Sequence, residues 1–322
     1  MTDAPLFPRI TLIGLGLIGS SLARGIQQLG LAGELVATDA SPEVRARAAE
    51  IKLADRIADD NASAVKDSDL IISCVPVGRA GDVAQSIAPH LKPGAIISDV
   101  GSVKASVFAA MSEHLPDSVH FIPAHPVAGT ENSGPDSGFA ELFMNRWCIL
   151  TPPDGADAAA VEKLSTLWST LGANVEIMGA AHHDLVLAVT SHLPHLIAYT
   201  IVGTADELED VTRSEVLKFS AGGFRDFTRI AASDPTMWRD VFLTNKDAVL
   251  EMLGRFNEDL SALARAIRWG DGEALHKHFT RTRTIRRSII QTGQDTAVAD
   301  FGRGAPPADN ASDQNKGGKA PS

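Results

Sequence analysis

This chain of 322 residues has few cysteines and fewer basic than acidic residues. It holds two cysteines, Cys74 and Cys148, each inside an apolar run. One disulfide is possible by count, but two buried free thiols in a reducing compartment are favoured. The net charge is −11, whereas a general nucleic-acid binder needs a basic face for phosphates. The composition therefore argues against that class of protein.

Long apolar runs and a basic N-terminal segment are also missing. No uninterrupted apolar run reaches the ~20 residues that a helix needs to cross a bilayer. Residues 1–9 contain Asp3 and lack the basic start of a secretory signal, so no signal peptide is expected. Hydrophobic residues make up 44% and charged residues 21%, as in ordinary globular proteins. We expect a cytoplasmic protein with no membrane or nucleic-acid partner.

A glycine-rich turn, residues 14–19, follows the first expected strand at residues 9–13 and leads into a helical pattern. This is the arrangement of a dinucleotide-binding turn. Gly14 permits the tight turn, Gly16 lets the backbone approach a pyrophosphate, and Gly19 lets the helix pack closely on the strand. The helix N-terminus then offers free N–H groups to phosphates. Taken alone, the pattern also suits a packed strand–helix corner.

An acidic residue, Asp39, ends the next expected strand, about 20 residues after Gly19. A carboxylate there accepts hydrogen bonds from ribose hydroxyls and repels the 2′-phosphate of NADP. Arg45 and Arg47 lie nearby and weaken that preference, so NAD is the expected cofactor and NADP the alternative. The residues expected to contact the cofactor are Gly14, Gly16, Leu17, Ile18, Gly19, Asp39 and Val75.

Strand and helix patterns alternate through the first half of the chain. The expected strands are apolar throughout rather than alternating, which is typical of a parallel sheet covered on both faces. The fold class expected is α/β, with an N-terminal Rossmann-type doubly wound sheet. Further strands are expected at residues 70–75, 95–99, 121–124, 147–151 and 174–178, and helices at 42–53, 80–91 and 157–171.

From residue 180 onward no convincing strand pattern occurs. Amphipathic stretches at residues 182–209, 234–254 and 255–292 indicate an all-helical second domain. Gly, Pro, Ala, Asp, Asn and Ser dominate the last residues, which favours disorder there. The expected divisions are a dinucleotide-binding domain at 1–179, a helical domain at 180–297 and a disordered tail at 298–322.

His125 is the first candidate for chemistry, because it follows the apolar run of residues 121–124 and precedes glycine and small polar residues. An open α/β sheet places its chemistry at the carboxyl ends of its strands. A second candidate is Ser102, in the strand-to-helix turn of residues 100–104. Ser102 is either a helix N-cap or a functional hydroxyl, and the two roles are compatible.

Two histidine groups follow in the helical half. The triplet at residues 182–184 is expected to be a solvated or capping helix start. His192 and His195 are three residues apart, but Pro194 between them distorts the helix, and no cysteine or carboxylate completes a ligand set. We therefore expect no metal site and one functional histidine with a structural neighbour.

Two arginines lie further along the chain, four residues apart. Arg225 and Arg229 on one helical face could form a fork for carboxylates. The alternative is a surface pair bridged to Asp226 and Asp240. The spacing of Trp238 favours a core position over one facing a ligand.

Six motifs in this order resemble those of the prephenate/arogenate (cyclohexadienyl) dehydrogenase family of tyrosine biosynthesis. The glycine motif is generic, whereas the other five in combination are specific. The resemblance implies a Rossmann domain, a helical domain that forms a homodimer, and NAD(P)-linked oxidative decarboxylation of prephenate, arogenate or both. The motifs lie at residues 14–21, 99–104, 125–131, 191–195, 223–229 and 234–240.

The resemblance also implies roles for single residues. It makes His125 the base that takes the proton of the ring hydroxyl, and Ser102 the hydroxyl that orients His125 and the substrate. A neutral imidazole, with an ordinary pKa of ~6.5, suits that task at cytoplasmic pH. The implied substrate-binding residues are His195, Arg229 at the ring carboxylate, Arg225 at the side-chain carboxylate, Trp238 from the partner subunit, and Thr130.

Two rival functions share part of this pattern. Other Rossmann-plus-helical dehydrogenases, for hydroxy acids or pyrroline carboxylate, carry the glycine motif but use a lysine or none of these histidines. A non-catalytic NAD-binding sensor would leave His125, His195 and Arg229 with no reason to occur together. The spacing does not separate prephenate from arogenate.

Overall fold

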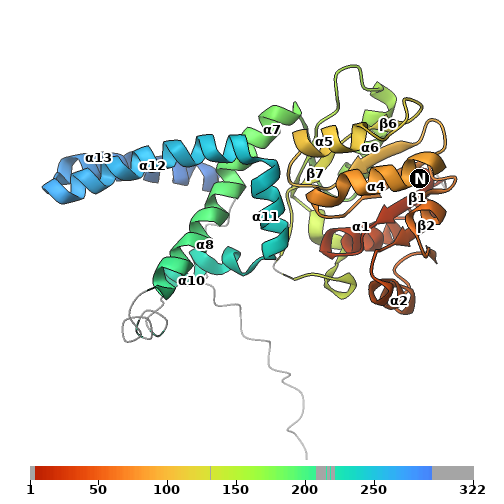
Figure 1. Ribbon diagram of the computed structural model, residues 1–322, viewed down its shortest axis with the longest axis horizontal. Coiled ribbons are helices and arrows are strands. Elements are labelled where there is room, and N and C mark those ends of the chain that lie inside the picture. The colour runs from red at the N-terminus through yellow and green to blue at the C-terminus, as the bar shows by residue number, and fades with distance from the viewer. Residues whose placement is uncertain (1–3, 131, 208–214, 216–217, 219–221, 292–322) are drawn as a thin grey trace, which may run out of the picture. The chain divides into compact units, whose positions relative to one another are not determined.

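The structure is a computed structural model that describes residues 4–130, 132–207, 215, 218 and 222–291 (Figure 1). Its contacts divide the chain into two compact units, which are described separately. The first unit is Met1–Thr200 with Ile230–Asp259, and the second is Ile201–Arg229 with Leu260–Ser322. The expected tail, 298–322, lies outside the described residues.

Six parallel strands form the main sheet, in the order β3-β2-β1-β4-β5-β6. This order is that of a doubly wound dinucleotide-binding sheet, and it confirms the expected fold. Since β1 pairs with both β2 and β4, the direction of winding reverses beside β1, where such folds bind their ligands. The strands are β1 (Phe7–Ile13), β2 (Ala32–Thr38), β3 (Arg56–Ile57), β4 (Leu70–Ser73), β5 (Ile96–Asp99) and β6 (His120–Phe121).

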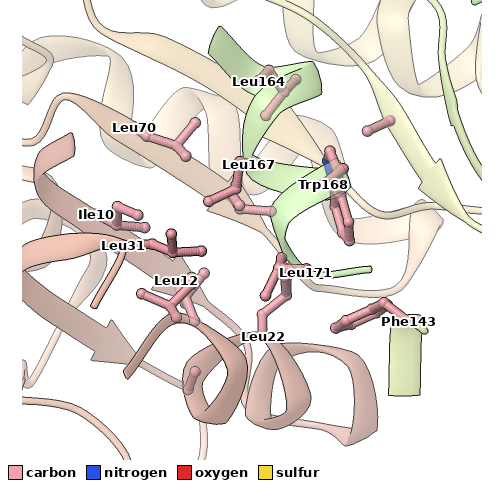
Figure 2. Close-up of a cluster of buried hydrophobic side chains, with 14 of the residues drawn as sticks. Ile10, Leu12, Leu22, Leu31, Leu70, Phe143, Leu164, Leu167, Trp168 and Leu171 are labelled. Carbon is pink, nitrogen blue, oxygen red and sulfur yellow. The ribbon is translucent and has the colours of Figure 1, made fainter. Parts of the chain in front are cut away.

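Helices cover both faces of this sheet, as the unbroken apolar strands predicted. Successive strand residues point to opposite faces, so Ile10 and Leu12 pack in one apolar cluster and Ile13 in the other. Figure 2 shows the first cluster, where Leu164, Leu167 and Trp168 of α6 meet strand residues and Leu22 of α1. The helices are α1 (Leu17–Gln28), α2 (Pro42–Glu50), α3 (Asn61–Val65), α4 (Ala80–Ile87), α5 (Ala105–Ser112) and α6 (Ala158–Thr170), and the short turns are η1 (Val77–Arg79), η2 (Ala88–His90), η3 (Pro135–Ser137) and η4 (Ala140–Phe143).

A second, three-stranded sheet contains β7 (Ala124–Pro126), β8 (Trp147–Leu150) and β9 (Asn174–Ile177). The strand expected at residues 121–124 is therefore wrong in detail. Ile122 still donates its N–H to β5, but Pro123 has no N–H, so the chain leaves the first sheet there. It resumes as β7, which runs antiparallel to β8 and carries His125 at its centre opposite Ile149.

The described residues after Ala180 contain helices and no strand, as expected. A π-helical turn, η5, separates the first two helices just before Pro194. A proline has no N–H to donate to the preceding turn, and such turns often occur at functional sites. The helices are α7 (Ala180–Leu187), η5 (Ala188–His192), α8 (Leu193–Asp206), α10 (Gly222–Thr228), η6 (Arg229–Ala232), α11 (Pro235–Thr244), α12 (Lys246–Trp269) and α13 (Gly272–Gln291).

One continuous helical stretch, Ala180–Asp206, has the length and composition of a membrane-crossing helix, with a mean hydropathy of 1.6 over 18 residues. The expectation concerned uninterrupted apolar runs, and polar residues such as His183, Asp184 and His192 interrupt this stretch. The stretch includes His183, Asp184 and His192, which are buried and hydrogen-bonded within the first unit. Charged and imidazole side chains are costly in a bilayer, and these ones have protein partners. Cys74 and Cys148 are both free, as favoured, with Cys148 buried and Cys74 half-buried.

Candidate active site

The glycine turn has the geometry of a phosphate cradle. Gly14 has a φ of +96°, and a side chain there would collide with the carbonyl oxygen of Cys74. A side chain on Gly19 would collide with the carbonyl of Gly14, so only glycine allows α1 to start this close to β1. The space beside Gly16 is open, and no side chain caps the N-terminus of α1. The turn therefore fits a pyrophosphate, which would be bound by backbone N–H groups.

Asp39 lies just past β2 and is half-buried beside this turn. Its Oδ2 accepts the N–H of Leu15 at 2.8 Å, and its Oδ1 accepts the N–H of Ser41 at 2.9 Å. The carboxylate therefore braces the glycine turn, and each oxygen keeps a lone pair for a ribose hydroxyl. Arg45 donates to the backbone carbonyl of Asp39 at 2.6 Å.

Arg47, the second arginine expected to weaken the preference for NAD, is engaged elsewhere. Its guanidinium binds the carboxylate of Asp136 at 2.7 Å and that of Glu50 at 2.7 Å. Asp136 belongs to η3, on the loop that follows His125, so this exposed ion pair joins that loop to α2. Arg47 is thus directed toward carboxylates in this structure.

The other residues expected to contact the cofactor lie close by. Val75 lies half-buried two residues past β4, and its Cγ1 is 3.2 Å from where a Cβ of Gly14 would be. The side chains of Leu17 and Ile18 pack into the apolar cluster under α1. Leu17 is buried there, which leaves its backbone N–H as its group for a cofactor, whereas Ile18 is half-buried.

His125 is 7% exposed and belongs to a chain of buried polar groups. Its Nδ1 lies 2.8 Å from Nε2 of His183, and Nδ1 of His183 lies 2.8 Å from Oδ1 of Asp184. The triplet at residues 182–184 was expected to be solvated or capping. That prediction is wrong for His183, which is completely buried, although His182 is exposed.

The order of these groups determines where the protons reside. Burial lowers the pKa of His125 well below its ordinary value, and the nearby His183, Lys104 and His192 lower it further. Burial also lowers the pKa of His183, so both rings are neutral near pH 7. Because the carboxylate of Asp184 accepts from Nδ1–H of His183, Nε2 of His183 must accept from Nδ1–H of His125. Nε2 of His125 is then left with a lone pair, as a general base requires.

Asp184 also caps α5. Its two oxygens accept the N–H groups of Lys104 at 2.7 Å and Ala105 at 2.9 Å. Burial alone would raise the pKa of Asp184, but the hydrogen bonds from His183 and these two N–H groups lower it overall. Ser102 precedes this cap in the chain and makes no capping hydrogen bond at the start of α5, so its N-cap role is wrong. Its half-buried hydroxyl remains a candidate for substrate binding.

The second histidine pair surrounds Trp238. Asn245 donates to the carbonyl of Asp184 at 2.9 Å and to Nδ1 of His192 at 3.1 Å, which places the proton of His192 on Nε2. Burial lowers the pKa of His192 to about 4. His195 stacks on Trp238, with ring centroids 3.7 Å apart. Trp238 is 7% exposed, so it packs in the core of its own chain and reaches His195 without a partner subunit.

The remaining candidates are exposed. Thr130 lies on the loop after His125 and accepts the N–H of Asn132. Arg225 and Arg229 belong to the second compact unit, as does Asp226. Asp240, the other acid considered for these arginines, pairs instead with Arg239 at 2.7 Å. The structure does not by itself assign any of these three residues to a substrate.

Comparison with known proteins decides the family. A model of the nucleotide-binding domain of prephenate dehydrogenase matches residues 22–177, and a model of the prephenate dehydrogenase dimerization domain matches residues 179–281. The chain belongs to the prephenate dehydrogenase family. The expected family, the doubly wound fold and the class of NAD(P)-linked oxidoreductase are thereby confirmed.

Relatives and solved structures agree with this family. A cyclohexadienyl dehydrogenase of Zymomonas mobilis is 44% identical over 88% of this chain and 97% of its own length. A prephenate dehydrogenase of Bacillus subtilis is 34% identical over 87% of this chain and 76% of its own. The prephenate dehydrogenase of Aquifex aeolicus, solved with hydroxyphenyl propionate and NAD+, has a TM-score of 0.81 at 30% identity and covers 87% of this chain and 98% of its own. An arogenate dehydrogenase of Synechocystis has a TM-score of 0.75 at 27% identity, with 87% and 99% covered.

Sequence reasoning missed several buried members of the site. They were missed because each is tens of residues from His125 in the sequence and comes near it only in the folded chain. The one available signal was composition: charged and imidazole residues in otherwise apolar segments are rarely buried without a partner. The missed residues are His183, Asp184, Lys104, Asp99 and Asn245.

Proposed function

We propose that this chain oxidises and decarboxylates a cyclohexadienyl ring with NAD, taking prephenate, arogenate or both. The observation that carries the proposal is His125, a neutral buried imidazole whose free nitrogen is set by His183 and Asp184. His125 lies at the carboxyl edge of the parallel sheet, since Ala124 hydrogen-bonds to Asp99 at the end of β5. The names of the relatives agree with this substrate class.

His125 acts as the base for the ring hydroxyl. Its Nε2 accepts the hydroxyl proton, while Nδ1–H stays hydrogen-bonded to His183 and stabilises the imidazolium that forms. Asp184 fixes the tautomer of His183 and supplies the negative charge that the imidazolium requires. Ser102, in the turn after β5, is the hydroxyl that we propose orients the substrate. No group of three or more potential metal ligands occurs in the described part of the chain.

The glycine turn and Asp39 hold the cofactor. Backbone N–H groups at the start of α1 bind the pyrophosphate, and Asp39 accepts from the ribose hydroxyls and disfavours a 2′-phosphate. NAD bound by these residues would supply the hydride acceptor for the ring carbon that bears the hydroxyl, and loss of carbon dioxide would then make the ring aromatic.

Substrate recognition is proposed for a further set of side chains. His195, held flat against Trp238, presents an imidazole beside an aromatic surface. An arginine guanidinium can hold a carboxylate through two parallel hydrogen bonds, which suits Arg229 and Arg225 to the two carboxylates of the substrate. Thr130 supplies a hydroxyl from the loop after His125.

We further propose a cytoplasmic homodimer. The family model for residues 179–281 describes a dimerization domain, and the two family models meet near the proposed boundary at residue 179. The second compact unit exposes large apolar side chains that a partner would cover. They are Leu260, Ile267, Trp269, Phe279 and Ile285, with exposures from 51% to 73%.

A steady-state assay of the purified protein tests this function by following the absorbance of the reduced nicotinamide. Prephenate and arogenate are each combined with NAD and NADP. Turnover of either ring substrate supports the proposal, and the ratios of kcat/KM name the preferred pair. NAD binding without turnover of either substrate would refute it.

A further inference from the structure

A completely buried lysine lies at the edge of the strand that carries His125. Lys104 is 0% exposed, and its ammonium donates to Oδ2 of Asp99 at 2.5 Å and to the carbonyl of Ala124 at 2.6 Å. Asp99 is 3% exposed, and its Oδ1 accepts the N–H of Ala124 at 3.3 Å. Asp99 Oδ2 also accepts the N–H of Gly101, in the turn that carries Ser102. The two side chains together satisfy both backbone groups of Ala124.

These contacts satisfy the backbone groups at the unpaired edge of β7 in the second sheet. Pro123 accepts from Thr151 and Val127 donates to Trp147, so the odd-numbered residues face β8. In an antiparallel strand the next residue points its N–H and C=O to the other side, so Ala124 faces away from β8. No strand pairs with that edge of β7 among the described residues. The Asp99–Lys104 pair supplies there the donor and the acceptor that a neighbouring strand would offer.

We propose that the Asp99–Lys104 pair is a positioning device for His125. The pair holds the residue before His125 by both its N–H and its C=O, and so ties β7 to the end of β5 and to the turn of Ser102. The base and the hydroxyl thereby keep one relative position, although His125 belongs to the second sheet and Ser102 to the turn after β5 of the first. This inference rests on the proposed function in that His125 is the base.

Stability alone is a poor reason for such a pair. Burying two charges costs about as much as their attraction returns, and apolar side chains of similar size often replace a buried pair without loss of stability. A misplacement of a reacting group by about 1 Å, by contrast, can cost about 100-fold in rate. If the pair serves to position His125, its removal should lower kcat more than it lowers the free energy of unfolding.

The charge of Lys104 has a second effect on His125. The ammonium opposes protonation of the imidazole and so lowers the pKa of His125. The other titratable groups around the ring are His183 and Asp184 from α7 and the adjoining His192, with Asp99 from β5 and Cys148 from β8 near Lys104. Removing the ammonium should raise the pH at which activity is lost on the acid side, a change that a purely structural role would not produce.

Three variants test the pair in the full-length enzyme. Lys104→Met removes the donors at similar length, and Lys104→Gln keeps an N–H donor but no charge. Thr11→Val is the matched control, because Thr11 is a buried side chain of β1 that hydrogen-bonds to Ala64 and Ser68 rather than to the Asp99–Lys104 pair. We expect Lys104→Met to lower kcat about 100-fold with the KM for NAD unchanged. Lys104→Gln should recover most of kcat. In both Lys104 variants the acid side of the pH–activity profile should remain shifted to higher pH.

Amide hydrogen exchange gives a readout that does not depend on turnover. Exchange in a peptide covering residues 121–127 should rise in Lys104→Met and stay at the wild-type level in Thr11→Val. If the wild-type enzyme turns over neither ring substrate, the proposed function fails while the exchange result still decides whether the pair holds β7. The inference would be overturned if folded Lys104→Met had the kcat, the acid side of the pH–activity profile and the amide exchange of the wild-type enzyme.

A further variant covers the case in which Lys104→Met does not fold. Asp99→Leu with Lys104→Met replaces the pair by apolar side chains, a change that buried pairs commonly tolerate. Loss of kcat in this folded double variant supports the positioning role, and wild-type kcat refutes it. Failure of both variants to fold would assign the pair to folding and would also overturn the proposal.

Discussion

Replacement of His183 tests the tautomer chain most directly. Its Nε2 accepts the Nδ1–H of His125 at 2.8 Å in a completely buried position. His183→Leu removes this acceptor, and a buried donor without a partner costs about 1–3 kcal/mol. His125 can avoid that cost by moving its proton to Nε2, which then cannot accept the substrate's proton. If the tautomer with the proton on Nε2 is favoured by this free energy, the population of the tautomer that can act as a base falls by roughly 5- to 150-fold.

The expected result is a fall in kcat within that range, with the KM for NAD unchanged because the glycine turn is untouched. A general base contributes about 10²–10⁴-fold, so a loss beyond that range would need another cause. His183→Gln keeps an acceptor oxygen near Nδ1 of His125 and should recover much of the rate. The assay is the initial rate with prephenate or arogenate across pH 5–9, together with the melting temperature of each variant.

The neighbouring histidine supplies the control. His182 is exposed one position earlier on α7, so His182→Leu should leave kcat, KM and the pH profile at wild-type values. Equal rates for folded His183→Leu and His182→Leu would show that His125 does not depend on His183 for its tautomer. The mechanism would then need another group to orient the base.

Three further results are expected. Asp39→Ser should lower kcat/KM for NAD and raise it for NADP, because it removes the carboxylate that repels a 2′-phosphate; an unchanged ratio in the steady-state assay would contradict this. His192 has a pKa of about 4 when folded and ~6.5 when unfolded, so the unfolded chain binds more protons between these values and stability falls as pH drops from 6.5 toward 4. The loss amounts to at most about 3 kcal/mol, and His192→Gln should flatten this part of the urea-unfolding profile, whereas an unaltered slope would refute the assignment. Ile267→Asp places a charge on a 67% exposed apolar side chain and should yield monomers in light scattering. A dimeric variant would show that this side chain lies outside the interface.

Local patterns in the sequence determined the fold and the cofactor half of the site. The glycine turn works through backbone torsions and close packing between neighbours in the chain, so its residues predict its geometry directly. Gly14 has the left-handed conformation that the pattern required, and Asp39 lies beside the turn as expected. Unbroken apolar strands likewise predicted a sheet buried on both faces, because strand residues alternate between the two faces.

Tertiary structure alone decided how the catalytic half is arranged. His125 and His183 are 58 residues apart and meet through a side-chain hydrogen bond that no local periodicity encodes. The same holds for Asp184, which caps α5 from 80 residues away and thereby replaces Ser102 as the cap. Lys104 likewise gives no sign in the sequence that its ammonium is buried and donates to the carbonyl of Ala124 at the edge of β7. A short segment of sequence specifies torsions and faces, whereas proton positions and pKa values depend on which distant groups share a low-dielectric interior.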